Sequence, residues 1–182
     1  TQSNTEPYKG FREGRYVSMG EKDMERLREH VPELDVITPV MFGGTKDAVV
    51  GDKSFTANIS GVSFDYPEIN PPIMFYGRFL NEMDIREGRK VCVIGKEVYK
   101  KLFPGGGDPC GKSIRIDGTY YKVVGVDYKV DGININGRPD QLVTIPYSLF
   151  RKIYNSGDQI HSLAVTAKPG VVMSSITDRM RT

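Results

Sequence analysis

One stretch of the chain matches a phosphate-binding loop in residue types and spacing. It runs from Gly106 to Ser113 and reads Gly-Gly-Asp-Pro-Cys-Gly-Lys-Ser, which fits the pattern of Gly, four residues and Gly-Lys-Ser. That pattern binds nucleotide phosphates where a helix follows the loop, because the helix N-terminus supplies the amide donors. Here residues 113–118 alternate like a strand and end in a turn, and Pro109 removes one amide. We therefore expect a turn at this place and not a nucleotide site.

A cluster of acidic residues lies near the middle of the chain. Glu82, Asp84 and Glu87 alternate with Arg86 and Arg89. Two carboxylates at a suitable separation would permit the acid–base chemistry of a glycosidase. Because each acid has an arginine close by in the sequence, a solvated and charge-balanced loop is the favoured interpretation.

Histidine and serine residues offer no recognisable catalytic or metal-binding arrangement. His30 and His161 are the only histidines, and neither lies in a close-spaced cluster with cysteines or carboxylates. Ser148 and Ser174 are not part of a Gly-x-Ser-x-Gly motif and have no evident base partner. We therefore expect a chain that is not an enzyme, with no catalytic, cofactor-binding or metal-binding residues and no cofactor.

The two cysteines, Cys92 and Cys110, leave the redox compartment open. A disulfide between them is an alternative in an oxidising space. Free thiols are favoured, because Cys92 lies in the apolar run 91–94 and reads as a small core residue. Cys110 lies in a loop rich in Gly and Pro, with no evident approach to Cys92.

Composition describes an ordinary globular chain. It has 182 residues, of which 38% are hydrophobic and 26% charged, too apolar for a disordered chain. The 25 basic and 23 acidic residues nearly cancel, which argues against a nucleic-acid partner. The longest uncharged runs, such as 54–64, are far shorter than the ~20 apolar residues of a membrane-spanning helix. Residues 1–15 do not resemble a signal peptide, and a chain that begins at Thr1 is interpreted as a piece of a larger protein.

The N-terminal part alternates between helical and strand patterns. Residues 1–15 predict an arm or linker. A capping box at 18–21 predicts the start of a helix that Pro32 ends. The range 34–42 predicts a strand, and a hairpin with one buried and one wet face is predicted around Gly51-Asp52.

The central part predicts a strand, a helix and a second hairpin. Val91 to Gly95 reads as a buried strand, and Lys96 to Phe103 as a helix with an apolar inner side. The hairpin turns at Asp117-Gly118. Its predicted strands are 112–117 and 119–127, with inner positions Ile114, Ile116, Val124 and Val126.

The last third again alternates between strand and helix. It predicts a strand over 142–145, a helix opened by Pro146 and ended near Gly157, a strand over 160–167 and a final helix over 172–180. Together with the N-terminal pattern, this order predicts an α+β fold. Its core would be a ferredoxin-like split βαβ subdomain built from both chain ends and interrupted by a β-rich insert.

Two turn-rich segments, 70–72 and 130–140, mark the expected boundaries of that insert. The predicted organisation is an arm or linker at 1–15, one subdomain from 16–70 and 139–182, and an inserted β-rich subdomain at 71–138.

Residues 69–76 place large apolar side chains on a proline-stiffened stretch, Ile-Asn-Pro-Pro-Ile-Met-Phe-Tyr. Packing at the junction of the two subdomains is the favoured role. A contact surface for another protein or an apolar ligand is the alternative.

Short motifs follow one another in a defined order through the centre of the chain. They are Gly77-Arg78-Phe79, Asp84, Val91 to Gly95, Leu102-Phe103, Asp108 to Ile114, Gly118 and Tyr121 to Val126, flanked by Gly61-Val62, Tyr66, Asp140, Val143 and Ile145-Pro146. This order resembles the MacB-type periplasmic core domain of ABC-transporter permeases, a superfamily that also contains FtsX-like and lipoprotein-exporting permeases. The resemblance extends from about Glu21 to Tyr154. Three glycines at 105–107 lengthen the loop before the Asp-Pro motif and are a departure from the pattern.

The resemblance implies a domain outside the cytoplasmic membrane, between the first and second transmembrane helices of a four-helix permease. One part would be porter-like and built from both chain ends, and the β-rich insert would be Sabre-like. The implied partners are a cytoplasmic ABC ATPase domain or subunit, a second permease copy, and a periplasmic adaptor protein or cargo. The implied function is to couple ATP hydrolysis mechanically to efflux or export. The alternative is a stand-alone periplasmic ligand-binding or sensory domain.

Overall fold

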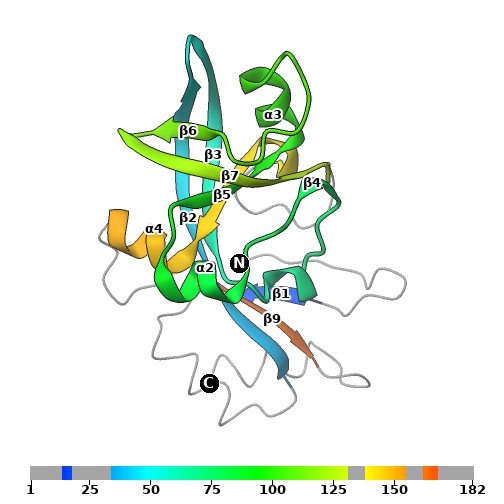
Figure 1. Ribbon diagram of the computed structural model, residues 1–182. Helices are drawn as coiled ribbons and strands as arrows, with labels where there is room; N and C mark the ends of the chain where they lie inside the picture. The colour runs from blue at the N-terminus through cyan, green and yellow to red at the C-terminus, as the bar shows by residue number, and fades with distance from the viewer. Residues whose placement is uncertain (1–13, 18–33, 131–137, 155–161, 168–182) are drawn as a thin grey trace.

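The structure, a computed structural model, describes residues 14–17, 34–130, 138–154 and 162–167 (Figure 1). The predicted arm, the helix begun by the capping box, the helix over 172–180, and the residues His30, Gly157, His161 and Ser174 lie wholly or mostly outside these ranges.

A barrel of six strands forms the centre of the described part of the chain. The strands close on themselves because β6 pairs with both β7 and β2. Going around the barrel, the strands are β2 (Leu34–Val50), β3 (Lys53–Val62), β8 (Leu142–Pro146), β5 (Val91–Gly95), β7 (Thr119–Asp127) and β6 (Ser113–Ile116). The pairs β3–β8 and β5–β7 are parallel, and the other four pairs are antiparallel. Closure leaves these strands few free edges.

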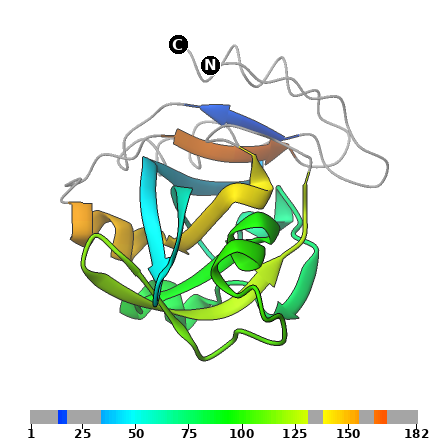
Figure 2. The same ribbon diagram turned by 90° about the horizontal axis from the view of Figure 1, so that it is seen from above.

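Three further strands extend the barrel at two places. β1 (Gly14–Val17) and β9 (Ser162–Ala167) lengthen the sheet beside the first half of β2. They lie on one side of the molecule, away from helix α3 (Figures 1 and 2). The short strand β4 (Met74–Gly77) pairs with the second half of β7 and lies at the end of the strand order. β4 is therefore an edge strand among the described residues.

Short helices cover the barrel and its openings. They are α2 (Glu82–Glu87), α3 (Lys96–Leu102), α4 (Tyr147–Tyr154), and the 3-10 turns η1 (Tyr66–Glu68) and η2 (Pro139–Gln141). α2 and α4 are tied together where the Ser148 hydroxyl donates to the Ile85 carbonyl at 2.5 Å.

The main core fills the barrel. Each large apolar side chain buried here stabilises the fold by roughly 1.5–3 kcal/mol. Its largest fully buried members are Tyr121, Phe150, Met41, Ile59, Ile94, Leu102, Ile114, Ile116, Ile145 and Leu149. A second cluster lies on the outer face beneath α2 and includes Leu80, Ile85 and Val93. The sheet is thus buried on both faces where α2 covers it.

The α+β class and both hairpins are confirmed. Strands of the segment 71–138 pair with strands on both sides of it, β5 with β8 and β6 with β2, so the sheet is continuous across the expected boundaries. The division into a ferredoxin-like part and an inserted part stays a prediction.

Two sequence predictions about strands need correction. The strand expected over 34–42 continues to Val50, because a register shift between Phe42 and Thr45 lets β2 keep its pairing with β3. Val124 was expected to face the core but is only partly buried and packs against the outer cluster. A register shift in β5–β7 leaves Val124 as one extra residue in β7, so Val123 and Val126 both reach the main core.

Candidate protein-interaction face

The stretch that resembles a phosphate-binding loop forms a closed turn between α3 and β6. The Asp108 carboxylate accepts from the Cys110 amide at 2.9 Å, and the Gly111 amide donates to the Val123 carbonyl at 2.9 Å. The Lys112 amide donates to the Pro109 carbonyl at 3.0 Å. These three amides bond to other groups of the protein. The loop is followed by the strand β6, so no helix N-terminus supplies the amide donors that bind phosphate.

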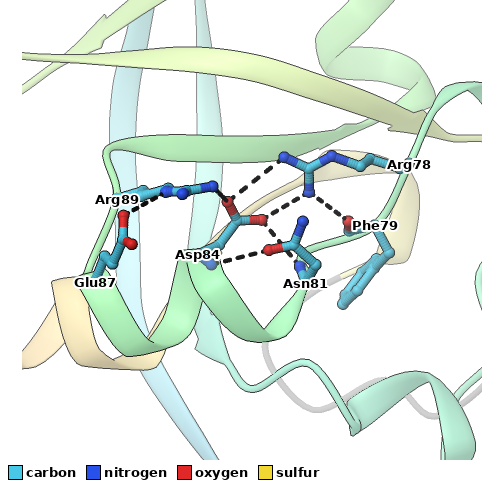
Figure 3. A network of polar contacts seen from close by, with 6 residues as sticks. All are labelled: Arg78, Phe79, Asn81, Asp84, Glu87 and Arg89. Atoms are coloured by element: carbon cyan, nitrogen blue, oxygen red, sulfur yellow. Dashed lines mark hydrogen bonds and ion pairs between the residues drawn. The ribbon is translucent and has the colours of Figure 1, made fainter.

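The acidic cluster is not the solvated loop that was expected. It forms the helix α2, with Asn81 and Asp84 in a reciprocal capping box. The Asp84 side chain is 0% exposed, and it accepts from Arg78 Nη1 at 2.7 Å, from Arg89 Nη1 at 3.4 Å and from the Asn81 amide at 2.9 Å (Figure 3). The charge pattern indicated balanced charges but could not show that one carboxylate is buried.

Asp84 is held in its charged form. Burial by itself raises the pKa of a carboxyl, but the hydrogen bonds from Arg78 and from the Asn81 amide outweigh burial and lower the pKa of Asp84 below its usual value. Both arginines are partly exposed, 44% for Arg78 and 40% for Arg89. The network ties the end of β4 to the start of α2, which is an architectural task.

Other motif residues also have architectural positions. Asp140 is buried within η2 and accepts from Arg138 Nη2 at 2.7 Å. Ser148 serves the tie between α2 and α4 described above. Among the residues that the structure describes, no group of three or more His, Cys, Asp or Glu side chains is arranged to hold a metal ion.

Both cysteines are free thiols. β7 separates them, because Cys92 pairs with Val123 from one edge of that strand while Gly111, next to Cys110, bonds to Val123 from the other edge. Two neighbour spacings across a sheet exceed the ~7 Å limit between the Cα atoms of a disulfide. Burial raises the pKa of the Cys110 thiol to about 11, so this thiol is not activated.

An exposed apolar surface lies where β4 meets the end of β7, and we call it the aromatic face. It consists of Ile73, Phe75, Tyr128 and Val130. Ile73 is 59% exposed, Phe75 54% and Val130 49%, while Tyr128 is half-buried. The sequence pointed to residues 69–76 as either packing or a contact surface. Both roles occur, since Ile69 is buried while Ile73 and Phe75 face outward.

Stacked rings support the aromatic face from below. Phe75 stacks on Tyr128 with ring centroids 4.2 Å apart and an interplanar angle of 11°. The Tyr76 ring centroid lies 4.7 Å from that of Phe75, in an edge-to-face arrangement, and 5.8 Å from that of Tyr99 in α3. Tyr99 in turn donates its hydroxyl to the Gly107 carbonyl at 2.6 Å. The exposed rings are therefore connected to the core and fixed in orientation.

Backbone contacts hold the same surface in place. Asp127 accepts from the amides of Ile73 and Lys129, both at 2.9 Å, and the Tyr128 amide donates to the Ile73 carbonyl at 2.8 Å. The Lys129 ammonium donates to the Pro71 carbonyl at 3.0 Å and to the Asn70 side chain. Burial raises the pKa of Asp127, and the hydrogen bonds from the Ile73 and Lys129 amides partly offset that rise.

Sequence reasoning missed half of the aromatic face. Tyr128 lies just beyond the predicted strand 119–127 and Val130 begins the predicted loop 130–140, and only the pairing of β4 with β7 brings them beside Ile73 and Phe75. Lys96 also escaped notice; its ammonium lies 5.2 Å over the Tyr128 ring, within cation–π distance.

The described residues thus form a closed barrel with an exposed aromatic surface where β4 meets the end of β7. Residues 2–182 match the family model of the MacB-like periplasmic core domain, and the chain belongs to that family.

Relatives of known name agree with this assignment. The chain is 30% identical over 142 residues to the macrolide export ATP-binding/permease protein MacB of Chlorobium phaeobacteroides. That alignment covers 76% of this chain and 21% of the relative. It is 33% identical over 119 residues to the pyoverdine export ATP-binding/permease protein PvdT of Pseudomonas aeruginosa, covering 65% of this chain and 18% of that protein. The chain thus spans about a fifth of the length of these relatives.

Solved structures share the fold. The periplasmic region of MacB from Actinobacillus actinomycetemcomitans superposes with a TM-score of 0.75 at 23% identity, over 90% of this chain and 72% of that one. The extracellular domain of the transporter YknZ from Gram-positive bacteria gives a TM-score of 0.72 at 17% identity, over 87% of this chain and 78% of that one. No helix in the described ranges is both long and apolar enough to cross a membrane.

Proposed function

We propose that the chain is the extracytoplasmic domain of a MacB-type export permease and that it couples ATP hydrolysis elsewhere in the parent protein to export. The observation that carries this proposal is the aromatic face, a rigidly held apolar surface on a member of this domain family. An exposed surface of this kind is costly in water unless another molecule covers it during function.

The assignment of partners follows from the relatives. The two relatives described above are ATP-binding/permease proteins, which supports an ATPase domain or subunit as the source of energy. A second permease copy and an adaptor protein or cargo outside the membrane complete the proposed assembly. The domain itself would transmit movement and carry out no chemistry.

The domain's place would be outside the cytoplasmic membrane, between the first and second transmembrane helices of the parent. The sequence of the parent gene tests this directly. Apolar runs of ~20 residues on both sides of the segment are expected. Their absence, together with a small ligand that binds the chain, would instead establish a stand-alone ligand-binding or sensory domain.

Export can be tested in cells. We would delete the parent gene and measure how much of a panel of compounds accumulates, including a macrolide and pyoverdine, which the names of the two relatives give. We expect one or more compounds to accumulate, and the intact gene to restore export. A parent in which a Gly-Ser linker replaces residues 34–167 should reach the membrane and fail to restore export. Full restoration by that variant would contradict a coupling role for the domain.

A further inference from the structure

Strand β2 pairs with different strands along its two halves. Its first part, residues 34–40, pairs with β9, which in turn pairs with β1. Near its other end, Ala48 and Val49 pair with β6 and so close the barrel. We call β1, β9 and residues 34–40 the base sheet. Figure 1 shows β1 and β9 toward one end of the molecule and the hairpin of β2 and β3 at the other.

A β-bulge lies in β2 between these two halves. The register of β2 with β3 shifts between Phe42 and Thr45. Gly43 and Gly44 of β2 therefore stand opposite a single residue of β3, and such a bulge bends its strand. The φ of Gly44 is +69°, and a Cβ added there would meet nothing within 4 Å. Close packing thus does not explain the glycine at position 44, whereas the bend of the backbone does.

Fewer strands hold β2 at the bulge than on either side of it. The pairing with β9 ends at Val40, and the pairing with β6 begins at Ala48. Residues 45–47 pair with β3 alone among the described strands. β3 itself ends at Val62, opposite Val40, so β2 is the one described strand that continues from the barrel into the base sheet. A change of angle at the bulge would therefore disturb few strand pairs.

Helix α4 packs against the same place. A Cβ added to Gly43 would lie 3.0 Å from the Phe150 ring, and one added to Gly61 of β3 would lie 2.8 Å from the Phe150 side chain. These two glycines let Phe150 lie directly against the backbone beside the bulge. Ser148 ties α4 to α2, and Asp84 ties α2 to the end of β4. A continuous set of contacts therefore joins the bulge to the strand that carries the aromatic face.

The outer ends of β1 and β9 lie side by side in the base sheet. The two strands are antiparallel, with Gly14 at the start of β1 opposite Thr166, and β9 ends at the next residue, Ala167. Opposed residues of an antiparallel pair have Cα atoms about 4.5–5.5 Å apart. In the proposed parent permease, movement that reaches these ends would act on the base sheet, and the barrel would follow through β2.

We propose that Gly43 and Gly44 form a hinge in β2, about which the base sheet and the barrel move relative to each other during export. A hinge is a short stretch that takes up the change in backbone dihedral angles while the parts on either side stay rigid. This inference rests on the proposed function, because it specifies how movement reaches the barrel that carries the aromatic face.

Distances between spin labels in the 182-residue chain test the hinge. Arg15→Cys in β1 and Lys122→Cys in β7 carry labels across the bulge, and Ser54→Cys in β3 with Lys122→Cys is the reference pair within the barrel. Cys110→Ser removes the half-buried thiol, and Cys92 stays because it is buried. We expect pulsed dipolar spectroscopy to give a distance distribution about twice as broad across the bulge as within the barrel. Equal widths would refute the hinge.

Gly44→Ala and Gly51→Ala separate a hinge from a general loss of stability. The two glycines have φ of +69° and +59°, and an added Cβ would meet nothing within 4 Å at either. A Cβ restricts a backbone at positive φ similarly at both sites, but only Gly44 lies in the bulge. We expect Gly44→Ala to narrow the Arg15–Lys122 distribution to about the width of the reference pair, and Gly51→Ala to leave it unchanged.

Asparagine provides a second matched pair, should Gly44→Ala fail to fold. Gly44→Asn and Gly51→Asn then repeat the comparison, because Asn adopts a positive φ more readily than Ala. Identical distance distributions in the two variants would overturn the hinge.

The outcome is separable from that of the proposed function, because the distances are measured without export. Equal widths for the two label pairs, together with loss of export in the parent that lacks residues 34–167, would leave the coupling role intact and reject only the hinge. A broad distribution that Gly44→Ala narrows, together with full export in that parent, would reject the coupling role and leave the hinge.

Discussion

Asp84 combines complete burial with a full set of donors. An ionised carboxylate without partners would be expensive inside the protein, but here two guanidinium groups and one backbone amide bind it. The hydrogen bonds lower its pKa in the folded state. The unfolded chain therefore binds the proton more tightly, and the stability that this group contributes is present at neutral pH and lost on acidification.

Replacing Asp84 with Asn tests this account at the residue scale. The amide can still cap α2, but it loses the charge that binds Arg78 and Arg89, so we expect a loss of about 2–4 kcal/mol in urea unfolding at pH 7. The unfolding free energy of the wild type should fall as the pH drops below about 4, and the variant should show a smaller fall. Equal pH dependence of the two proteins would show that Asp84 does not carry this effect.

Gly77 ends β4 with a backbone that other residues rarely adopt. Its φ is +66°, and a Cβ added there would lie 2.0 Å from the Val124 carbonyl oxygen. We expect Gly77→Ala to cost about 3 kcal/mol or more in the free energy of unfolding. Gly51 is the matched control, because its φ is +59° and an added Cβ would meet nothing within 4 Å. Gly51→Ala should cost only the energy of holding a residue with a Cβ at a positive φ, about 1–2 kcal/mol. Equal losses of unfolding free energy in the two variants would contradict the close approach at Gly77.

At the scale of elements, α2 and α4 are expected to depend on each other. Ser148→Ala removes the hydrogen bond to the Ile85 carbonyl, but that carbonyl keeps the Gly88 amide as a donor at 3.2 Å. We therefore expect a modest loss of about 0.5–1.5 kcal/mol and faster hydrogen exchange in the amides of α2. Ser54→Ala, at an exposed position of β3, is the control and should change neither quantity. Unchanged exchange in α2 of the Ser148 variant would show that the tie has no energetic role.

Local chemistry explains which elements the sequence could predict. Gly51-Asp52 and Asp117-Gly118 are strong turn signals, so both hairpins were predictable from short stretches. The bulge at Val124 and the register shift after Phe42 depend on partner strands far away in the chain, so alternation alone misassigned Val124. The helix α2 was missed because five of the eight residues from Glu82 to Arg89 are charged, which is typical of a solvated loop. The pattern does not show that Asp84 among them is buried and caps the helix.

Long-range pairing also determines the candidate site. Ile73 and Phe75 could be recognised as apolar residues on a stiff segment, but whether they would be covered depended on the topology. Tyr128, Val130 and Lys96 join them only through the pairing of β4 with β7 and of β7 with β5. Separate apolar residues in the sequence therefore became one surface only in the folded molecule.

At the scale of the whole molecule, the closed barrel is a rigid support with the aromatic face at one edge. Tyr120 lies at the other end of β7, about 23 Å from Asp127 for an extended strand of this length, and is equally exposed. It offers a control for exposed aromatic surface that does not belong to the aromatic face. Coupling in the parent permease is expected to depend on the aromatic face and not on Tyr120.

The most direct measurement is export by the full-length parent carrying Ile73→Glu and Phe75→Glu, compared with the parent carrying Tyr120→Glu. Export would be followed as the cellular accumulation of a compound whose level the wild-type parent lowers, at matched amounts of permease in the membrane. We predict that the double variant loses most of its export, because two carboxylates would prevent an apolar partner from covering the aromatic face, while Tyr120→Glu retains it. Full export by the double variant would contradict the central claim that this face couples the domain to its partner.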